Sequence, residues 1–517
     1  MEKLIVVNVL LLASQPARLP VRLAIRYAVS SNFTSGRGQS PFFYALTPGK
    51  EKKVYRLASY DFAAHIHLYQ WKELTILLDV NSGAIHVLDE TACDFINSLI
   101  QHRGDFYLAT EDCSGRHPAP EVMEVAREIL ALYEEGEIFT AEEEISLDLS
   151  VLPLKALCLN VAHACNMKCS YCFAQQGNFG MKPALMSFDI GKKAFDFLIG
   201  NSGQVKNLEV DFFGGEPLLN FEVVKSLVLY GRRLEEETGK HFNFTLTTNA
   251  LLLDEEIRDF IIEHDMAVIL SLDGRPQTND RHRILNNDEG SYALVLPRIR
   301  QMVAANPVSY YIRGTFTRHN LDFVEDLRHI IDLGFNNLSL EPAIGADSPY
   351  AIREQDLPRV LKEYETLTDT LLEYDQRGQD IHFFHYNLNL QQGPCLAKRR
   401  SGCGAGVDYL AVTPEGDIYP CHQFVGEKNF CMGNVADGLL DRNVRHRFQT
   451  NHLGNKAQCR QCWARNFCGG GCHANNFFSN GDIAVPAEIS CTMHKKRIEG
   501  AIYQDLHKRV DKNQKIR

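Results

Sequence analysis

Residues 154–177 read LKALCLNVAHACNMKCSYCFAQQG, and this stretch decides the fold. It opens on a short, mainly apolar run at 154–161, which predicts a buried strand. Three cysteines, Cys165, Cys169 and Cys172, follow at once in the spacing C-x-x-x-C-x-x-C. A structural zinc site is closed by four ligands, so three thiols on one loop leave one coordination position to be filled from elsewhere.

The alternation of strand and helix continues far beyond this loop. From residue 151 to about residue 380, apolar runs typical of strands alternate with amphipathic stretches typical of helices. This alternation predicts parallel strands joined by helical crossovers. We therefore expect an α/β fold with a partial (β/α)6 barrel, whose chemistry lies at the carboxyl ends of the strands. The expected strands are 154–161, 208–215, 244–249, 267–273, 310–316 and 338–343.

A small module precedes the barrel. Residues 65–71, 74–80 and 84–89 are typical of three short strands, and residues 90–101 of an amphipathic helix. Strands followed by helices predict a winged-helix-like domain, which ends in an acidic linker at about 139–150.

Length and charge restrict the possible partners. A chain of 517 residues exceeds a single core, so several domains are expected. Its net charge of −11 argues against nucleic-acid binding, which relies on basic side chains. The apolar run within residues 1–15 is interrupted by Asn8 and is too short to span a membrane. We expect the basic C-terminal stretch at 494–517 to form a solvated helix.

Fifteen cysteines in a chain of this size indicate metal or cluster ligation rather than a disulfide framework. A second group follows residue 390 with the spacing C-x12-G-x4-C, then C-x2-C-x5-C-x3-C, then one more cysteine. Its members are Cys403, Cys421, Cys459, Cys462, Cys468, Cys472 and Cys491, and Cys395 precedes them. The remaining thiols are expected to be ordinary ones: Cys93, Cys113, Cys158 and Cys431.

Two kinds of metal site are compatible with these thiols. Thiolates suit both zinc and iron in clusters. Zinc would take His163 as a fourth ligand beside the first three cysteines, and a pair of zinc knuckles would use the second group. The other interpretation is a 4Fe–4S cluster held by three protein thiols, whose fourth iron is left for a chelating molecule.

The loop and its surroundings resemble the radical S-adenosylmethionine (SAM) superfamily, whose signature is C-x-x-x-C-x-x-C after the first strand of a partial barrel. The resemblance implies that the open iron binds the amino and carboxylate groups of SAM. Cleavage of SAM then gives a 5′-deoxyadenosyl radical. The sequence GGEP at 214–217 resembles the motif that holds the methionyl amino group, and SLDG at 271–274 one that contacts ribose and carboxylate. The implied cofactor contacts are Tyr171, Gly214, Gly215, Glu216, Pro217, Ser271 and Arg283, whereas Thr248, Asn249 and Glu341 stand at the same rim without an assigned role.

The second cysteine group resembles the SPASM extension of this superfamily, which binds two auxiliary 4Fe–4S clusters. The resemblance implies three clusters in all. The inner auxiliary cluster takes Cys403, Cys421 and Cys472, and Cys395 either completes it or leaves an iron open for a substrate thiolate. The outer auxiliary cluster takes Cys459, Cys462, Cys468 and Cys491.

Over about residues 65–495 the chain is similar to the maturases of SCIFF peptides (six cysteines in forty-five residues). Those enzymes join a peptide cysteine sulfur to a backbone carbon of another residue. The resemblance implies a ribosomally made precursor peptide with a leader and several cysteines as substrate, and flavodoxin or ferredoxin as electron donor. The leader is expected to add as a strand beside residues 83–89.

Two other functions stay open at this point. One is a different peptide or protein oxidation by the same machinery, such as formylglycine formation in a sulfatase or a carbon–carbon crosslink. The other is a non-enzymatic zinc scaffold that binds peptides.

The expected organisation follows from these motifs. We expect a cytoplasmic protein with no nucleic-acid or membrane partner, because iron–sulfur clusters are poorly suited to an oxidising exterior. The expected divisions are an extension of unknown role at 1–60, a leader-recognition domain at 61–150, the radical SAM partial barrel at 151–390, the SPASM domain at 391–495 and a tail at 496–517.

Overall fold

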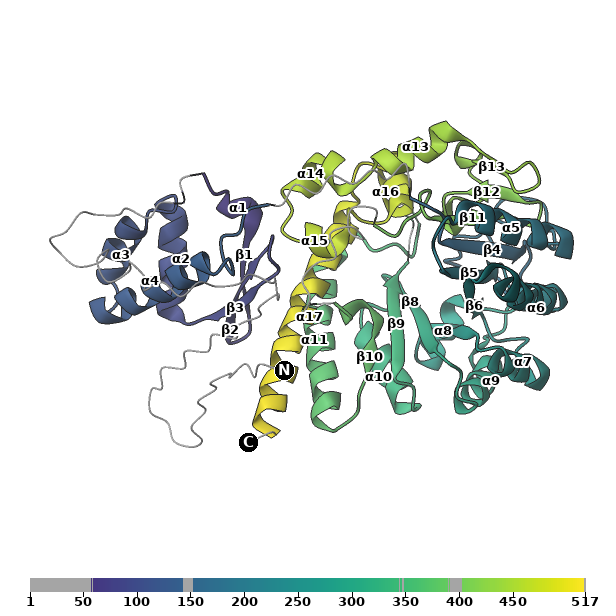
Figure 1. Ribbon diagram of the computed structural model, residues 1–517. Coiled ribbons are helices and arrows are strands. Elements are labelled where there is room, and N and C mark those ends of the chain that lie inside the picture. Colours follow the sequence, from purple (N-terminus) through teal and green to yellow (C-terminus); the bar gives the residue numbers. More distant parts are fainter. Residues whose placement is uncertain are drawn as a thin grey trace.

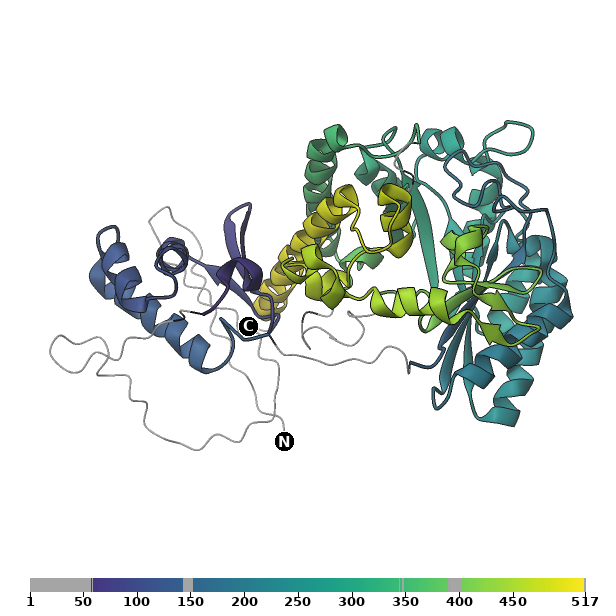
Figure 2. The ribbon, with the colours of Figure 1, turned by 90° about the horizontal axis from the view of Figure 1, so that it is seen from above.

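The computed structural model describes residues 57, 59–142, 152–343, 345, 348–388, 390 and 402–515, with the backbone alone at 439–440 and 510–515. Cys395 and nearly all of the expected extension at 1–60 lie outside these ranges. Figure 1 shows an N-terminal module on one side, a large sheet with its helices on the other, and one long C-terminal helix between them. Figure 2, a view from above, shows the same order.

One large mixed sheet forms the body of the molecule. It has eleven strands in the order β10-β9-β8-β7-β6-β5-β4-β11-β12-β13-β14. The strands from β4 to β10 are all parallel, which confirms the predicted α/β partial barrel. These strands are β4 Ala156–Ala162, β5 Asn207–Gly214, β6 His241–Thr248, β7 Ala267–Ser271, β8 Tyr310–Phe316, β9 Asn337–Pro342 and β10 His382–Phe383.

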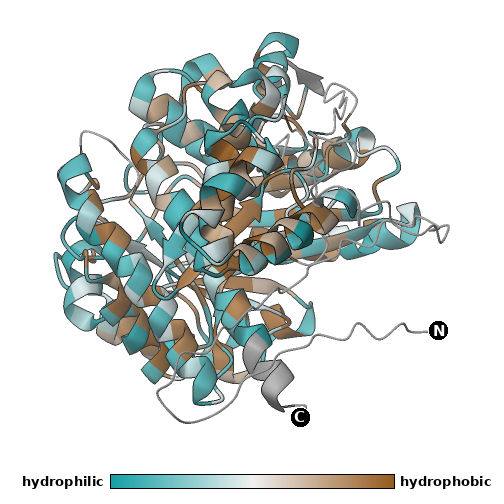
Figure 3. Ribbon diagram, turned by 90° about the vertical axis from the view of Figure 1, so that its left-hand side faces the viewer, coloured by the Kyte–Doolittle hydropathy of each residue, from teal (hydrophilic) through white to brown (hydrophobic). Residues whose placement is uncertain are grey.

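Helices cover the outer face of these strands. Hydrophobic and hydrophilic stretches alternate along them, as Figure 3 shows, so that their apolar sides pack on the sheet. Helices follow the strands, in agreement with the predicted alternation. The helices of this region are α5 Phe188–Asn201, α6 Phe221–Thr238, α7 Glu255–Glu263, α8 Pro276–His282, α9 Tyr292–Ala304, α10 Phe323–Asp332 and α11 Leu357–Gln376, with short 3₁₀ turns η3 Pro217–Asn220, η4 Glu354–Asp356 and η5 Phe384–Tyr386.

The C-terminal region extends the barrel sheet rather than standing apart from it. Strand β11 (Tyr409–Val412) pairs in parallel with β4, and three short antiparallel strands follow it. The apolar β11 covers the free edge of β4, which would otherwise expose unpaired backbone groups. The remaining elements are β12 Asp417–Tyr419, β13 Gly433–Asn434, β14 Leu439–Leu440, η6 His422–Phe424, η7 Lys428–Phe430, α13 Arg442–Thr450, η8 Leu453–Asn455, α14 Ala457–Arg460, α15 Arg465–Cys468, α16 His473–Asn480 and α17 Glu488–Lys515.

The N-terminal module is a three-stranded antiparallel sheet followed by helices. Its strand order is β1-β2-β3, so β3 lies at one edge. The three strands match the predicted ones, and the helices pack on the sheet around a core of their own. The elements are α1 Phe62–His65, β1 Ile66–Trp71, β2 Leu74–Asp79, β3 Ile85–Leu88, α2 Glu90–Gln101, α3 Phe106–Ser114 and α4 Ala119–Glu134.

The C-terminal helix α17 is not the solvated helix that its basic composition predicts. Its apolar side chains Ile498 and Ile502 are buried in one cluster with Trp71 of β1. The ammonium of Lys496 lies 3.9 Å from the centre of the Trp71 ring, and Glu499 accepts a 3.0 Å hydrogen bond from His67. A long aliphatic stem lets a lysine cover apolar surface, so the charges alone misled the prediction. No helix in the described ranges is both long and apolar enough to cross a membrane.

Truncating a side chain in the barrel core should destabilise the protein far more than truncating one on the surface. Phe195 is fully buried, and its ring lies 5.3 Å from that of Phe242. Phe195→Ala is expected to lower the free energy of unfolding of the barrel by about 3–5 kcal/mol, because it leaves a cavity. Leu229→Ala, at a side chain 53% exposed on α6, is the matched control and should change it little. Denaturant unfolding followed by circular dichroism compares the two, and equal effects would contradict this account of the core.

Candidate active site

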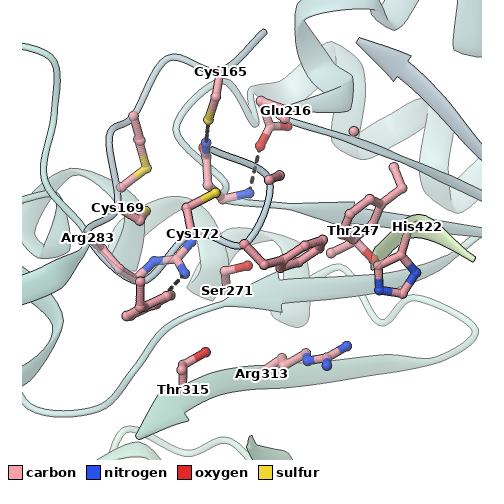
Figure 4. Close-up of a pocket in the computed structure, with 18 of the residues that line it drawn as sticks. Cys165, Cys169, Cys172, Glu216, Thr247, Ser271, Arg283, Arg313, Thr315 and His422 are labelled. Atoms are coloured by element: carbon pink, nitrogen blue, oxygen red, sulfur yellow. Dashed lines mark hydrogen bonds between the residues drawn. The ribbon is translucent and has the colours of Figure 1, made fainter. Parts of the chain in front are cut away.

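The first three cysteines lie at the carboxyl ends of the barrel strands. Strand β4 ends at Ala162, and the loop after it carries Cys165, Cys169 and Cys172 into one cavity. Figure 4 shows these thiols grouped on one wall of the cavity, with Arg313 and Thr315 on the strand opposite. The implied cofactor contacts Tyr171, Gly214, Gly215, Glu216, Ser271 and Arg283 line the same cavity. Pro217 does not line it, because it is buried at the start of η3.

The glycines after β5 allow the cysteine loop to approach closely. Gly215 N–H donates to the Ala162 carbonyl at 2.8 Å, and Glu216 N–H donates to the Ala164 carbonyl at 2.9 Å. A Cβ at Gly215 would lie 2.2 Å from the Ala164 oxygen and 2.7 Å from the Gly177 Cα. Two backbone segments therefore meet where no side chain fits. In this structure the glycines serve the contact between two loops of the chain.

Glu216 is a buried carboxylate held by three donors. Thr248 Oγ1 donates to it at 2.7 Å, Asn249 N–H at 2.8 Å and Leu218 N–H at 3.1 Å. Burial raises the pKa of Glu216 to about 7, although these hydrogen bonds favour the charged form. The Asn249 side chain also donates to Asn166 at 2.8 Å, within the cysteine loop. Thr248 and Asn249, to which the sequence assigned no role, thus position both Glu216 and the loop.

Tyr171 and Arg283 form a second buried group beside the thiols. Arg283 donates to the Tyr171 hydroxyl at 3.0 Å, and this hydroxyl donates to Asp273 at 2.5 Å. Burial raises the pKa of Tyr171 and that of Asp273. The tyrosine hydroxyl is thus occupied by the chain itself, and its ring is held along the cavity wall. Ser271, at the end of β7, lies on the same wall and is half-buried.

The other wall comes from β8, β9 and the C-terminal region. Arg313, Thr315 and Glu341 line the cavity from the strands, and His422 enters it from η6. Tyr409 and His422 Nδ1 share a 3.1 Å hydrogen bond. Burial and the nearby Arg313 lower the pKa of His422 to about 4, so the ring is neutral at pH 7. Sequence reasoning missed Arg313 and His422.

Two groups of mutual neighbours can be distinguished among the described cysteines of the C-terminal region. Within the SPASM-like region, Cys403 and Cys472 are electrostatic neighbours of Cys421. Cys491 has a different set of neighbours, which are Cys459, Cys462 and Cys468. Of the four cysteines expected to be ordinary thiols, Cys113 and Cys158 are buried, and the described cysteines form no disulfide.

The thiols of the cysteine loop lie in a buried setting. In the described part of the chain, no three histidine, cysteine or acidic side chains gather so closely that they could hold one metal ion. Burial raises the pKa of Cys165 to about 12 and that of Cys169 to about 11, so metal binding would release protons from them.

Comparison with known proteins agrees with this geometry. The model of a 4Fe-4S single cluster domain matches residues 156–294, and that of the SPASM iron-sulfur cluster-binding domain matches residues 403–463. A cysteine-type anaerobic sulfatase-maturating enzyme of Clostridium novyi is 23% identical over an alignment of 371 residues. The alignment covers 66% of this chain and 94% of the relative. The mycofactocin maturase MftC of Mycobacterium ulcerans is 24% identical over 62% of this chain and 84% of its own length.

The chain is thus similar to radical SAM maturases that carry a SPASM domain. The solved structure of anSMEcpe with bound AdoMet and Cp18Cys peptide shares the fold, with a TM-score of 0.57 and 21% identity. The superposed region covers 69% of this chain and 98% of the anSMEcpe chain. The two matched iron–sulfur domains favour iron–sulfur clusters over zinc at these cysteines. They also count against the non-enzymatic zinc scaffold.

A signal for the residues that sequence reasoning missed was present in the strand pattern. Ile312, Gly314 and Phe316 are buried under the helices, so the alternate residues of β8 point into the barrel. Arg313 and Thr315 are among those alternate residues. No comparable sequence pattern indicates His422, because the position of this residue depends on the pairing of β11 with β4.

The contact at Gly215 should be required for the first cluster. Gly215→Ala is expected to push the cysteine loop away from β5 and to lower the iron and sulfide content of the anaerobically prepared protein. Gly200→Ala on α5 is the matched control, because nothing lies within 4 Å of its added Cβ. Iron and acid-labile sulfide assays compare the variants. Full iron content in Gly215→Ala would contradict the role assigned to this contact.

Proposed function

We propose that this radical SAM enzyme forms thioether crosslinks between cysteine sulfur and backbone carbon in a ribosomally made, cysteine-rich precursor peptide. The observation that carries the proposal is the attachment of a separate strand-and-helix module to the SPASM side of a barrel with a three-thiol cavity. The similarity to SCIFF maturases over about residues 65–495 supports this choice of product. The similar anSMEcpe structure also holds a peptide.

The N-terminal module offers an edge for a leader peptide. Strand β3 pairs only with β2 among the described strands, so its outer edge is unpaired there. An extended leader can add to such an edge by backbone hydrogen bonds. The module is fixed to the rest of the enzyme, because Arg465 of α15 donates to the Ala64 carbonyl at 2.7 Å and to Asn81 at 2.8 Å. A bound leader would therefore be held at a constant place relative to the cavity.

The residues of the cavity fit SAM and a cluster. Cys165, Cys169 and Cys172 would hold the first 4Fe–4S cluster, Glu216 would accept the methionyl ammonium, and Ser271 with Arg283 would face the carboxylate and ribose. The backbone of Gly214 and Gly215 and the ring of Tyr171 would complete this wall. Two auxiliary clusters would use the inner and outer cysteine sets, with Cys395 as the unassigned fourth thiol of the inner set. We further propose a cytoplasmic location and a flavodoxin or ferredoxin as electron donor.

The balance of the reaction explains the need for auxiliary clusters. When bound, SAM and the reduced first cluster would supply a carbon radical able to take one hydrogen atom from the acceptor residue. Formation of the sulfur–carbon bond would also release the thiol proton and one electron, which clusters on the auxiliary sets would accept. Each crosslink thus removes two hydrogens from the peptide. Arg313, Thr315 and His422 on the opposite wall would position the peptide and keep water from the cavity.

A second candidate is formylglycine formation in a sulfatase, which the names of several relatives favour. One observation weighs against it. The alignment with the Clostridium novyi enzyme covers 94% of that enzyme but only 66% of this chain. About a third of this chain therefore has no counterpart there. An added peptide-binding module fits a leader-bearing substrate better than a folded sulfatase.

Binding of SAM should depend on the charge of Glu216. Glu216→Gln is expected to raise the SAM dissociation constant about tenfold or more, since a charge-assisted hydrogen bond is lost. In the unaltered enzyme, affinity should fall as the pH drops below about 7, because the protonated carboxyl no longer balances the ammonium. Glu222→Gln, at an exposed side chain, is the control. Anaerobic equilibrium dialysis with labelled SAM measures both effects, and unchanged affinity in Glu216→Gln would refute this role.

The activity itself has a distinct mass signature. We expect anaerobic incubation with reductant, SAM and a leader-bearing cysteine-rich peptide to remove two mass units per crosslink, and the crosslinked cysteines to resist alkylation. The variant with all three of Cys165, Cys169 and Cys172 changed to Ala is the control and should leave the peptide unchanged. The same mass loss with all thiols still alkylated would indicate a carbon–carbon crosslink instead. Release of 5′-deoxyadenosine without peptide oxidation would contradict the proposal.

A further inference from the structure

Lys456 is a buried cation at the centre of the SPASM domain. Its side chain is only 2% exposed, although lysine is normally a surface residue. The Nζ atom donates a 2.9 Å hydrogen bond to the carbonyl of Gly470. An ammonium carries three donors, so this bond leaves two of them for other groups around it.

The backbone that Lys456 contacts joins the two auxiliary cysteine sets. Gly469, Gly470 and Gly471 run from Cys468 of the outer set to Cys472 of the inner set. All three glycines have left-handed φ angles, of 72°, 95° and 77°. Only glycine adopts such a run without strain, so the chain turns tightly around the lysine amine. The amine is thus held at the middle of the shortest covalent link between the two sets.

Thiols of both sets surround this charge. Cys459, Cys468 and Cys491 of the outer set and Cys403 of the inner set are its electrostatic neighbours. The loop that carries Cys403 also packs on the glycine turn, because a Cβ at Gly402 would lie 3.2 Å from the Gly469 carbonyl oxygen. Lys456 is therefore within electrostatic reach of three thiols of the outer set and of Cys403 of the inner set.

No carboxylate in the described part of the chain pairs with Lys456. A buried charge without a partner is costly, and proteins retain one only where an opposite charge compensates it. Thiolate-ligated iron–sulfur clusters are anionic groups of that kind. The position of the lysine is explained if both sets hold such clusters.

We propose that Lys456 raises the reduction potentials of both auxiliary clusters, an inference that rests on the proposed function for the presence of two clusters. Reduction adds one electron, and a fixed positive charge nearby stabilises the more negative reduced state. Burial makes this effect larger, since little water screens the charge. Hydrogen bonds and net charge around the sulfurs are among the factors that set cluster potentials. Lys456 would make both clusters better acceptors of the electron released when a crosslink forms.

The test compares neutral and charged side chains at this position. The background protein has Cys165, Cys169 and Cys172 changed to Ala, so that the auxiliary clusters alone give a signal. In it, K456M removes the charge, K456Q removes it but keeps a donor for the Gly470 carbonyl, and K456R keeps it. K428M, at an exposed lysine of the same domain, is the matched control. A redox titration followed by electron paramagnetic resonance gives the midpoint potential of each cluster.

We expect the neutral variants to shift the reduction equilibrium of both clusters at least tenfold toward the oxidised form, about 59 mV for one electron. K456R and K428M should remain close to the background protein. Unchanged potentials in K456M or K456Q would overturn the proposal. Loss of the clusters in both neutral variants, with normal assembly in K456R, would also overturn it, since the role would then be structural. If the iron content of the background protein corresponds to fewer than two clusters, the result would instead refute the proposed function.

Discussion

The close contact between the cysteine loop and the glycine turn after β5 is the constraint on which the cavity depends. Two backbone hydrogen bonds of 2.8 and 2.9 Å hold the segments together, and there is no room for a side chain between them. This contact fixes the thiols relative to Glu216, which follows the turn directly. It also fixes Asn249, whose backbone binds Glu216 and whose side chain binds the loop. The cysteine loop, Glu216 and Asn249 are thus parts of one connected unit.

The helix α17 connects this unit to the N-terminal module. On one side its Glu499 bonds His67 of β1, and the His67 ring stacks on Trp463 with centres 3.7 Å apart. Two residues earlier, Arg497 lies 3.8 Å from Glu341 at the rim of the cavity. The N-terminal module and the cavity therefore both contact this one helix. The same helix begins beside Cys491, so the outer cysteine set shares this support.

The strands, most helices and the grouping of the cysteines could be predicted from sequence, because each rests on local periodicity or short spacing. The union of β11 with β4 could not be predicted in this way, since nothing local relates residues so far apart. For the same reason His422 was missed as a wall of the cavity. The burial of α17 contradicted a prediction from charge, because its apolar side chains pack with Trp71 and the Lys496 ammonium lies over that ring. Lys456 carried no signal in sequence, since its surroundings come from parts of the chain as far apart as Cys403 and Cys491.

The central claim is that the three-thiol loop leaves one iron of its cluster for SAM. The most direct test is electron–nuclear double resonance of the reduced enzyme with SAM labelled with ¹⁵N in its amino group. A nitrogen coupled to one cluster, and lost when Cys165, Cys169 and Cys172 are changed to Ala, is the predicted result. Bound SAM whose nitrogen couples to no cluster would contradict the account, because the fourth position would then belong to another ligand.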